Sequence, residues 1–185
     1  LLDIYYSLGI DKICAEISEK YKFEYDLNEI LSLLVCSRII APGSKRSSLE
    51  EANGFVEQPK CSLHQIYRAL EVIAKENDFF QSQLYKNSQS ITERRKDVLY
   101  YDCTNYYFEI EDEDDFRKYG VSKEHRPNPI VQMGLFIDSD GIPLSFSVFD
   151  GNFSEQPSMT PLEKKILQDF DTSDFVVCTD SGLSS

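Results

Sequence analysis

Apolar side chains recur at helical spacing through the first half of the chain. Ile10, Ile13 and Ile17 return every three or four positions, which predicts an amphipathic helix. A second apolar stripe runs over residues 30–39 and a third over residues 66–73. The spacing therefore predicts a helical region over residues 1–96.

Polar residues that cap helix starts accompany these stripes. A Ser, Thr or Asp followed three positions later by Glu or Gln can satisfy two free N–H groups of a first helical turn. These pairs predict where three helices begin. The pairs are Asp26 with Glu29, Ser47 with Glu50, and Ser62 with Gln65.

The pattern changes from helical to alternating at Asp97. Residues 98–108 are rich in Tyr and Phe and alternate with period two, which is typical of a β-strand. The acidic run at residues 109–115 follows and is interpreted as a solvated loop. Five side chains of the strand share one face, namely Val98, Tyr100, Asp102, Thr104 and Tyr106.

The remainder of the chain adds a hairpin, a helix and a strand. Asp140-Gly141 lies between two alternating runs and is a strong hairpin signal. Thr160-Pro161 opens a helix, because proline suits the first helical position. Residues 175–178 are apolar and predict a short buried strand. The predicted fold class is α/β, a mixed sheet with packed helices over residues 97–185, preceded by the helical region.

Charge is distributed unevenly over the 185 residues. Lys and Arg number 19 against 32 Asp and Glu, a net charge of −13. Residues 1–96 have a net charge of −1 and residues 97–185 a net charge of −12. The basic footprint that usually marks nucleic-acid binding is absent, which argues mildly against DNA. A site that collects metal cations would also be acid-rich.

Composition bounds the class of protein and its compartment. Hydrophobic residues make up 41% of the chain, enough for a buried core. The longest apolar stretch, residues 30–41, is too short to cross a membrane. Five scattered Cys are typical of reduced thiols, so we expect a cytoplasmic protein with no membrane partner. Because the chain begins at Leu1, we interpret it as a piece of a longer protein.

Two aspartates occupy positions where carboxylates could bind a cation. Asp102 lies inside the aromatic strand, where a buried carboxylate is costly unless it is paired. Asp180 follows the apolar strand, and ligands of open sheets collect beyond such carboxyl ends. If the two strands are parallel neighbours, both carboxylates can reach one point and would suit Mg²⁺. In the alternative interpretation, Asp102 makes an ordinary hydrogen bond and Asp180 caps a turn.

Three ordered segments resemble the DDE-type transposases of bacterial insertion sequences, in the branch with an insertion in its catalytic core. They are "VLYYDCTNYYFE", "YGVSKEHRPNPIVQMGLFIDSDGIPLSFSVFDGNFSE" and "DFVVCTDSGLSS". Residues 30–50 also resemble the helical segment upstream of that core. The resemblance implies that residues 97–185 are the first part of a ribonuclease H-like domain.

The resemblance assigns catalytic and metal-binding roles to two carboxylates. The family pattern apolar-Tyr-Asp-x-Thr matches Asp102 with Thr104, and the pattern Asp-x-Gly-Leu matches Asp180 with Gly182. The third catalytic residue of the family, a Glu, lies well downstream. It is absent from this chain, so we expect the piece alone to be inactive.

The same resemblance covers a basic loop and a glycine turn. The Ser-Lys-x-x-Arg-Pro run matches residues 122–127. Lys123 and Arg126, with His125 beside them, are the best local candidates for phosphate contacts, with an ordinary surface loop as the equal alternative. The Gly-Asn of the family matches Gly151-Asn152, with Glu155 following. The basic run over residues 94–96 is interpreted as a solvated helix end rather than a DNA contact.

The resemblance implies metal-dependent DNA phosphoryl transfer. Two Mg²⁺ or Mn²⁺ ions would serve the complete enzyme. That enzyme would cut double-stranded DNA at transposon ends and join the ends to target DNA, acting as a homo-oligomer. The helical region would assist DNA binding or assembly. Two other functions stay open, a ribonuclease H-like nuclease that does not join strands and a non-catalytic remnant or interaction domain.

Overall fold

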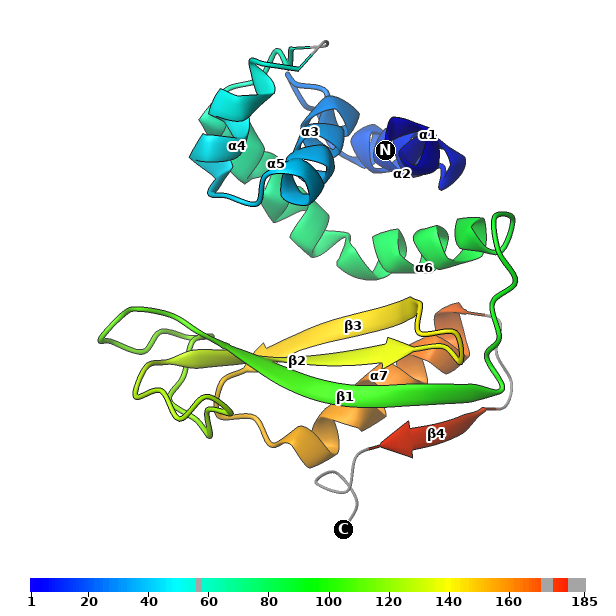
Figure 1. Ribbon diagram of the computed structural model, residues 1–185, viewed down its shortest axis with the longest axis vertical. Helices are drawn as coiled ribbons and strands as arrows, with labels where there is room; N and C mark the ends of the chain where they lie inside the picture. Colours follow the sequence, from blue (N-terminus) through cyan, green and yellow to red (C-terminus); the bar gives the residue numbers. More distant parts are fainter. Residues whose placement is uncertain (56–57, 171–174, 180–185) are drawn as a thin grey trace. The chain divides into compact units, whose positions relative to one another are not determined.

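The computed structural model describes residues 1–55, 58–170 and 175–179, which belong to two compact units (Figure 1). The chain divides into Leu1–Thr92, the helical unit, and Glu93–Ser185, the sheet unit. The division falls just before Asp97, where the sequence pattern changes. The mixed α/β class expected from the sequence, with a helical region first, is confirmed.

Helices account for the regular structure of the helical unit. In the part of the chain that the structure describes, no helix is long and apolar enough to cross a lipid bilayer. The helices are α1 (Leu2–Ser7), α2 (Ile10–Lys20), α3 (Leu27–Ile40), α4 (Lys45–Ala52), α5 (Leu63–Lys75) and α6 (Asn77–Ser88).

Two of the predicted caps begin helices as expected. The Asp26 carboxylate accepts hydrogen bonds from the N–H groups of Asn28 and Glu29, at 2.8 and 3.1 Å, at the start of α3. At the start of α5, Ser62 and Gln65 each accept from the other's backbone N–H, at 3.3 and 2.8 Å. These bonds satisfy N–H groups that have no partner within the helix.

The cap predicted at Ser47 is wrong. Helix α4 begins one turn earlier, after Ser44, whose hydroxyl accepts from the N–H of Ser47 at 3.1 Å. Ser44 directly follows the Pro42-Gly43 break, so the chain becomes helical as soon as that break ends. Ser47 has a Glu three positions later and Ser44 does not, so the capping-box signal alone gives the wrong helix start.

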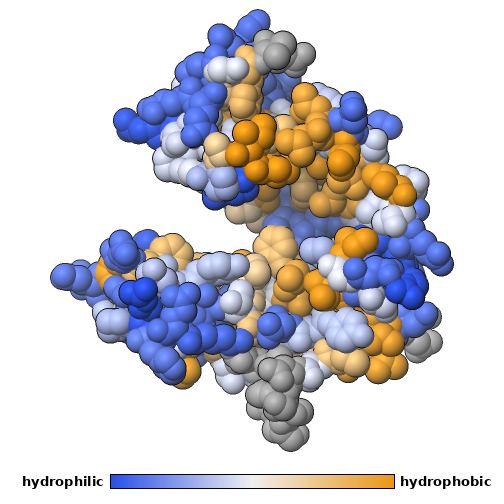
Figure 2. Space-filling model, viewed as in Figure 1, coloured by the Kyte–Doolittle hydropathy of each residue, from blue (hydrophilic) through white to orange (hydrophobic). Residues whose placement is uncertain are grey.

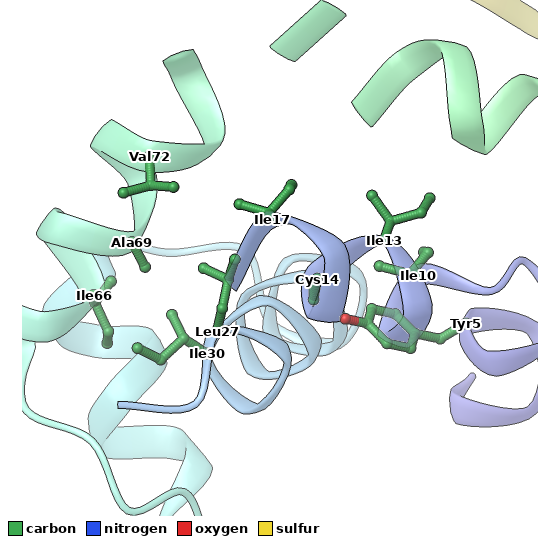
Figure 3. Packing of buried hydrophobic residues seen from close by; sticks show 10 residues of the cluster. All are labelled: Tyr5, Ile10, Ile13, Cys14, Ile17, Leu27, Ile30, Ile66, Ala69 and Val72. Atoms are coloured by element: carbon green, nitrogen blue, oxygen red, sulfur yellow. The ribbon is translucent and has the colours of Figure 1, made fainter. Parts of the chain in front are cut away.

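Apolar side chains of α1, α2, α3 and α5 form the core of the helical unit (Figure 3). The predicted stripe of α2 lies within it, with Ile13 and Ile17 2% and 0% exposed. The Tyr5 hydroxyl donates to Asn28 Oδ1 at 2.9 Å and ties α1 to α3. Burial raises the pKa of the Cys14 thiol to about 11. The cluster contains Tyr5, Ile10, Ile13, Cys14, Ile17, Leu27, Ile30, Ile66, Ala69 and Val72.

The sheet unit contains a mixed sheet of order β3-β2-β1-β4 (Figure 1). Strands β1 and β2 pair antiparallel, as do β2 and β3, whereas β1 and β4 are parallel. The hairpin predicted at Asp140-Gly141 connects β2 to β3 and is confirmed. The elements are β1 (Val98–Tyr107), β2 (Ile130–Ile137), β3 (Pro143–Asp150), α7 (Glu155–Asp169) and β4 (Val176–Thr179).

Helix α7 packs against one face of this sheet. The helix start predicted at Thr160-Pro161 is wrong, because α7 begins at Glu155 and Pro161 lies inside it. Leu99, Tyr101 and Cys103 of β1 point to that face and are almost fully buried. The hydroxyl groups of Tyr101 and Ser158 of α7 lie 2.6 Å apart, which fixes the helix to the strand. The Tyr101 ring crosses β2 at Gly134, where an added Cβ would collide with the phenol. This glycine is required for the close approach.

The opposite face of β1 carries the five side chains that the alternation predicted. Tyr100 and Tyr106 on this face are 47% and 51% exposed. Asp102 lies between them in sequence and is also exposed. The predicted strand face is therefore confirmed, and the helix-covered face is the other one.

Strand β4 lies at an edge of the described sheet. The parallel pairing with β1, on which the two-aspartate interpretation depended, is confirmed. The prediction of a buried strand is wrong, because Val176 is 62% exposed and Cys178 is exposed. An edge strand has a neighbour on one side, so a run of apolar residues does not guarantee burial.

Candidate functional site

Asp102 lies in the middle of β1 with its carboxylate open to solvent. Its side chain is 74% exposed, so the cost of burying a charge does not apply at this position. Oδ1 accepts a hydrogen bond from the backbone N–H of Cys103 at 2.8 Å. Leu135 of β2 is the cross-strand partner of Asp102. The strand therefore holds the carboxylate at a defined place on an accessible surface.

The parallel partner of β1 reaches the level of this carboxylate. Tyr101 pairs with Thr179, the last described residue of β4. The residues that follow Tyr101 and Thr179 in sequence are Asp102 and Asp180. Asp180, Gly182 and the rest of the C-terminal motif lie outside the described residues.

A loop between β1 and β2 brings positive charge to Asp102. The Nζ atom of Lys123 lies 3.8 Å from Asp102 Oδ1 and also donates to the backbone carbonyl of Cys103. Asn105 of β1 anchors the loop from both sides. Its Nδ2 donates to Val121 O at 3.3 Å, and its Oδ1 accepts from the Lys123 N–H at 3.3 Å.

A turn inside this loop explains the spacing of the Ser-Lys-x-x-Arg run. Ser122 is buried; its carbonyl accepts from His125 N at 3.0 Å and its hydroxyl from Arg126 N at 3.3 Å. His125 has a φ of 55°, the left-handed conformation that such a tight turn needs. The guanidinium of Arg126 stacks over the Tyr107 ring at 4.9 Å and lies 3.7 Å from Glu124. In Figure 2 this end of the sheet unit is largely hydrophilic.

Gly151 explains a second part of the resembling sequence. The bridge between Lys118 and Ile130 passes against Gly151, and an added Cβ would collide with both of their carbonyl oxygens. Gln132, buried in β2, donates to Gly151 O at 3.3 Å and to Phe153 O at 2.7 Å. The glycine therefore lets the start of the basic loop pack against the end of β3.

Two residues of the basic run over residues 94–96 form ion pairs with the turn between β2 and β3. Arg94 Nε donates to Asp138 Oδ2 at 2.6 Å, and both side chains are buried. Arg95 pairs with Asp140 in the same turn, and this pair is exposed. The interpretation of this run as a solvated helix end is wrong for Arg94, because its guanidinium is buried in an ion pair with Asp138.

The donor set for a metal ion is incomplete in the described part of the chain. Within residues 1–55, 58–170 and 175–179, no group of three or more His, Cys, Asp or Glu side chains could hold an ion. Asp102 supplies one hard oxygen ligand that is open to solvent, which fits Mg²⁺, an ion that keeps several waters and takes one or two carboxylates. Asp102 could therefore supply one of the carboxylate ligands of a Mg²⁺ site.

One groove of the helical unit is lined by none of the residues around Asp102. It has a volume of about 880 Å³ and is lined by α1, α3 and the segment before α5, including Leu2, Tyr6 and Ile40. Hydrophobic surface is visible on this unit in Figure 2. Because Asp102 and Lys123 do not line the groove, we assign it no role in metal or phosphate binding.

Sequence reasoning missed Asn105 and the structural role of Ser122. Asn105 lies in the segment "DCTNYY", but its bonds join residues far apart in the chain. A Ser four positions before an Arg was visible, yet nothing local showed that its hydroxyl organises the turn. Polar residues at the end of an aromatic strand are the signal that could have identified Asn105.

Comparison with known proteins gives one faint structural likeness. The sequence matches no known family and no curated protein. Among solved structures, the chain is similar to the Mos1 transposase in a paired-end complex with the left transposon end, at a TM-score of 0.29 and 8% identity. The match covers 85% of this chain and 53% of the transposase, so the chain spans about half its length. A likeness of this size carries no argument about function.

Proposed function

We propose that this chain is part of a DDE-type transposase that performs metal-dependent cleavage and strand transfer of DNA. The observation that carries the proposal is the parallel pairing of β1 with β4, which ends at Tyr101 and Thr179. An aspartate follows each of these residues in sequence. We propose that the register continues by one residue pair, so that Asp180 would lie beside Asp102 in the middle of β1.

The two carboxylates are proposed as ligands of Mg²⁺ or Mn²⁺. Asp102 is open to water and to a phosphodiester, as such a ligand must be. In the complete enzyme a pair of these ions would stabilise the attacking and leaving oxygens of the DNA backbone. The third carboxylate, a Glu, would come from outside this chain. Asp102 and Asp180 would act by holding positive charge beside an anionic substrate.

Lys123 and Arg126 are proposed as phosphate contacts. Both belong to the loop that Asn105 and Ser122 hold beside Asp102, and both side chains are about half exposed. Phosphate contacts position a duplex without reading its sequence. The partners of the parent protein would be transposon ends, target DNA and further copies of itself, with the helical unit assisting DNA binding or assembly.

Metal binding by the full chain tests the assignment. Electron paramagnetic resonance of Mn²⁺ would be recorded for the wild type and for Asp102→Asn, Asp180→Asn and Asp112→Asn. We expect the first two variants to lose the tightest bound ion. Asp112→Asn, which removes the same charge from the acidic run at residues 109–115, should retain it. Equal Mn²⁺ binding by all four proteins would contradict the proposal.

The strongly acidic second half favours one alternative, a non-catalytic interaction domain with the same fold. Residues 97–185 carry a net charge of −12, which repels DNA unless cations or other regions offset it. This alternative expects no specific metal ion at Asp102. Longer versions of the chain decide between the remaining functions, since strand-transfer products distinguish a transposase from a hydrolytic nuclease.

A further inference from the structure

The ammonium group of Lys123 occupies the surroundings of Asp102 from which a metal ion would bind. Its Nζ lies 3.8 Å from Asp102 Oδ1. The same group donates to the carbonyl of Cys103, the residue next to Asp102. Two oxygen acceptors of adjacent residues therefore share one cationic group.

The backbone of the loop, and not only a flexible side chain, holds Lys123 at this place. Asn105 binds Lys123 N and Val121 O, and Ser122 closes the turn that follows. The two Asn105 bonds start from β1, the strand that carries Asp102. Strand β1 therefore holds both the Asp102 carboxylate and, through Asn105, the backbone of Lys123.

We propose that Lys123 is an internal counter-cation that competes with the divalent metal ion for Asp102. A DNA phosphate that draws Lys123 away releases the carboxylate, so DNA and metal bind cooperatively. This inference rests on the proposed function, because it takes Asp102 as a metal ligand. Lys123 acts here as a positioning residue, through Asp102 and not on the reacting atoms.

Electrostatics gives the direction and the size of the effect of Lys123 on metal affinity at Asp102. Two cations close to one carboxylate repel each other, so Lys123 weakens metal binding while it stays paired. Its side chain is 46% exposed and that of Asp102 is 74% exposed, so solvent screens the pair. Exposed pairs of this kind change an equilibrium by about two- to fivefold. Because coupling is reciprocal, metal binding tightens DNA binding by the same factor.

The test measures Mn²⁺ affinity at one site of the full chain. Paramagnetic broadening of the Cys103 amide signal reports an ion at Asp102 separately from ions on the acidic run. Lys123→Met should tighten Mn²⁺ binding about two- to fivefold without DNA. Lys123→Arg, which keeps the charge, should stay near the wild type. Lys118→Met, which removes the same charge at the start of the same loop, should also leave the affinity unchanged.

A short duplex of arbitrary sequence completes the test. Saturating DNA should tighten Mn²⁺ binding more in the wild type than in Lys123→Met, by the same two- to fivefold. An unchanged affinity in Lys123→Met, with Cys103 still broadened, would overturn this inference and leave the proposed function intact. If the Cys103 signal of the wild type is not broadened, with or without DNA, this result would instead contradict the proposed function.

Discussion

Arg94 and Arg95 are neighbours in sequence with opposite surroundings. Arg94 and its partner Asp138 are 2% and 0% exposed, and Asp138 also accepts from the N–H groups of Asp140 and Ile142 at 3.0 and 2.9 Å. Arg95 pairs with Asp140 in solvent, and this bond lowers the pKa of Asp140. One short turn therefore contains both a buried and an exposed ion pair.

Breaking the buried pair should destabilise the sheet unit strongly. In Arg94→Met the carboxylate of Asp138 stays buried without its cation, which costs about 3–5 kcal/mol. Urea unfolding followed by circular dichroism measures the loss. Arg95→Met is the matched control and should leave the unfolding midpoint nearly unchanged. Equal midpoints for the two variants would show that Arg94 is solvated.

The thiols should differ in reactivity because burial disfavours the thiolate. The pKa of Cys14 is raised to about 11, so at pH 8 very little thiolate is present and the reagent cannot reach it. Cys178 is exposed. We expect iodoacetamide to label Cys178 first in the native protein and Cys14 only after unfolding. Labelling of native Cys14 should stay slow at both pH 8 and pH 9, because both values lie below its raised pKa. Mass spectrometry of peptides gives the order, and early labelling of Cys14 would contradict it.

Single residues of the candidate site could be found from sequence only where the signal is local. Asp102 could be identified because a carboxylate interrupts an aromatic strand. The buried role of Arg94 could not, since its partner Asp138 lies in the hairpin turn, far along the chain. The same holds for Asn105, whose partners are in the basic loop.

At the scale of elements, caps decide where helices begin, and α4 offers a direct test. Ser44→Ala removes the hydroxyl that accepts from Ser47 N and should cost about 1 kcal/mol. Ser47→Ala keeps the N–H group that donates this bond, so its effect should be smaller. Thermal unfolding of both variants distinguishes them. A larger loss in Ser47→Ala would restore the helix start that the sequence pattern predicted.

The contact between β1 and β2 at Gly134 sets how closely the two strands and α7 can pack. Gly134→Ala adds a Cβ where the Tyr101 ring lies, and overpacking of this kind costs about 1–3 kcal/mol. The loss should appear as a lower unfolding midpoint. Tyr101→Leu in the same background removes the phenol and should recover part of it. If the double variant is as unstable as the sum of the single variants, the clash is not the cause.

The periodicity of apolar residues predicted most helices and strands, but it did not predict how deeply each one is buried. The alternation of residues 98–108 gave both the strand β1 and its two faces. The apolar run at residues 175–178 gave a strand but not its exposure, because burial depends on neighbours that a local pattern does not contain. The sequence did not show whether β1 and β4 are parallel neighbours, because their pairing joins residues that are far apart in the chain.

At the scale of the whole molecule, charge limits how DNA can bind. With a net charge of −13, we expect weak association that depends on a few cationic side chains. Fluorescence anisotropy with a labelled duplex should show affinity falling steeply as salt rises. Lys123→Met should reduce the salt slope by about one. Tight binding that is insensitive to salt would contradict the electrostatic description.

The order in which the strands are synthesised differs from their order in the sheet. Strands β2 and β3 are joined by a short turn and can pair at once, whereas Val98 of β1 finds its partner Val176 only after α7 has been made. Contacts between such distant residues form late in folding. Until then one edge of β1, a tyrosine-rich strand, stays unpaired and open to other chains. Pairing with β4 covers this edge of β1 at Val98 to Tyr101, next to Asp102.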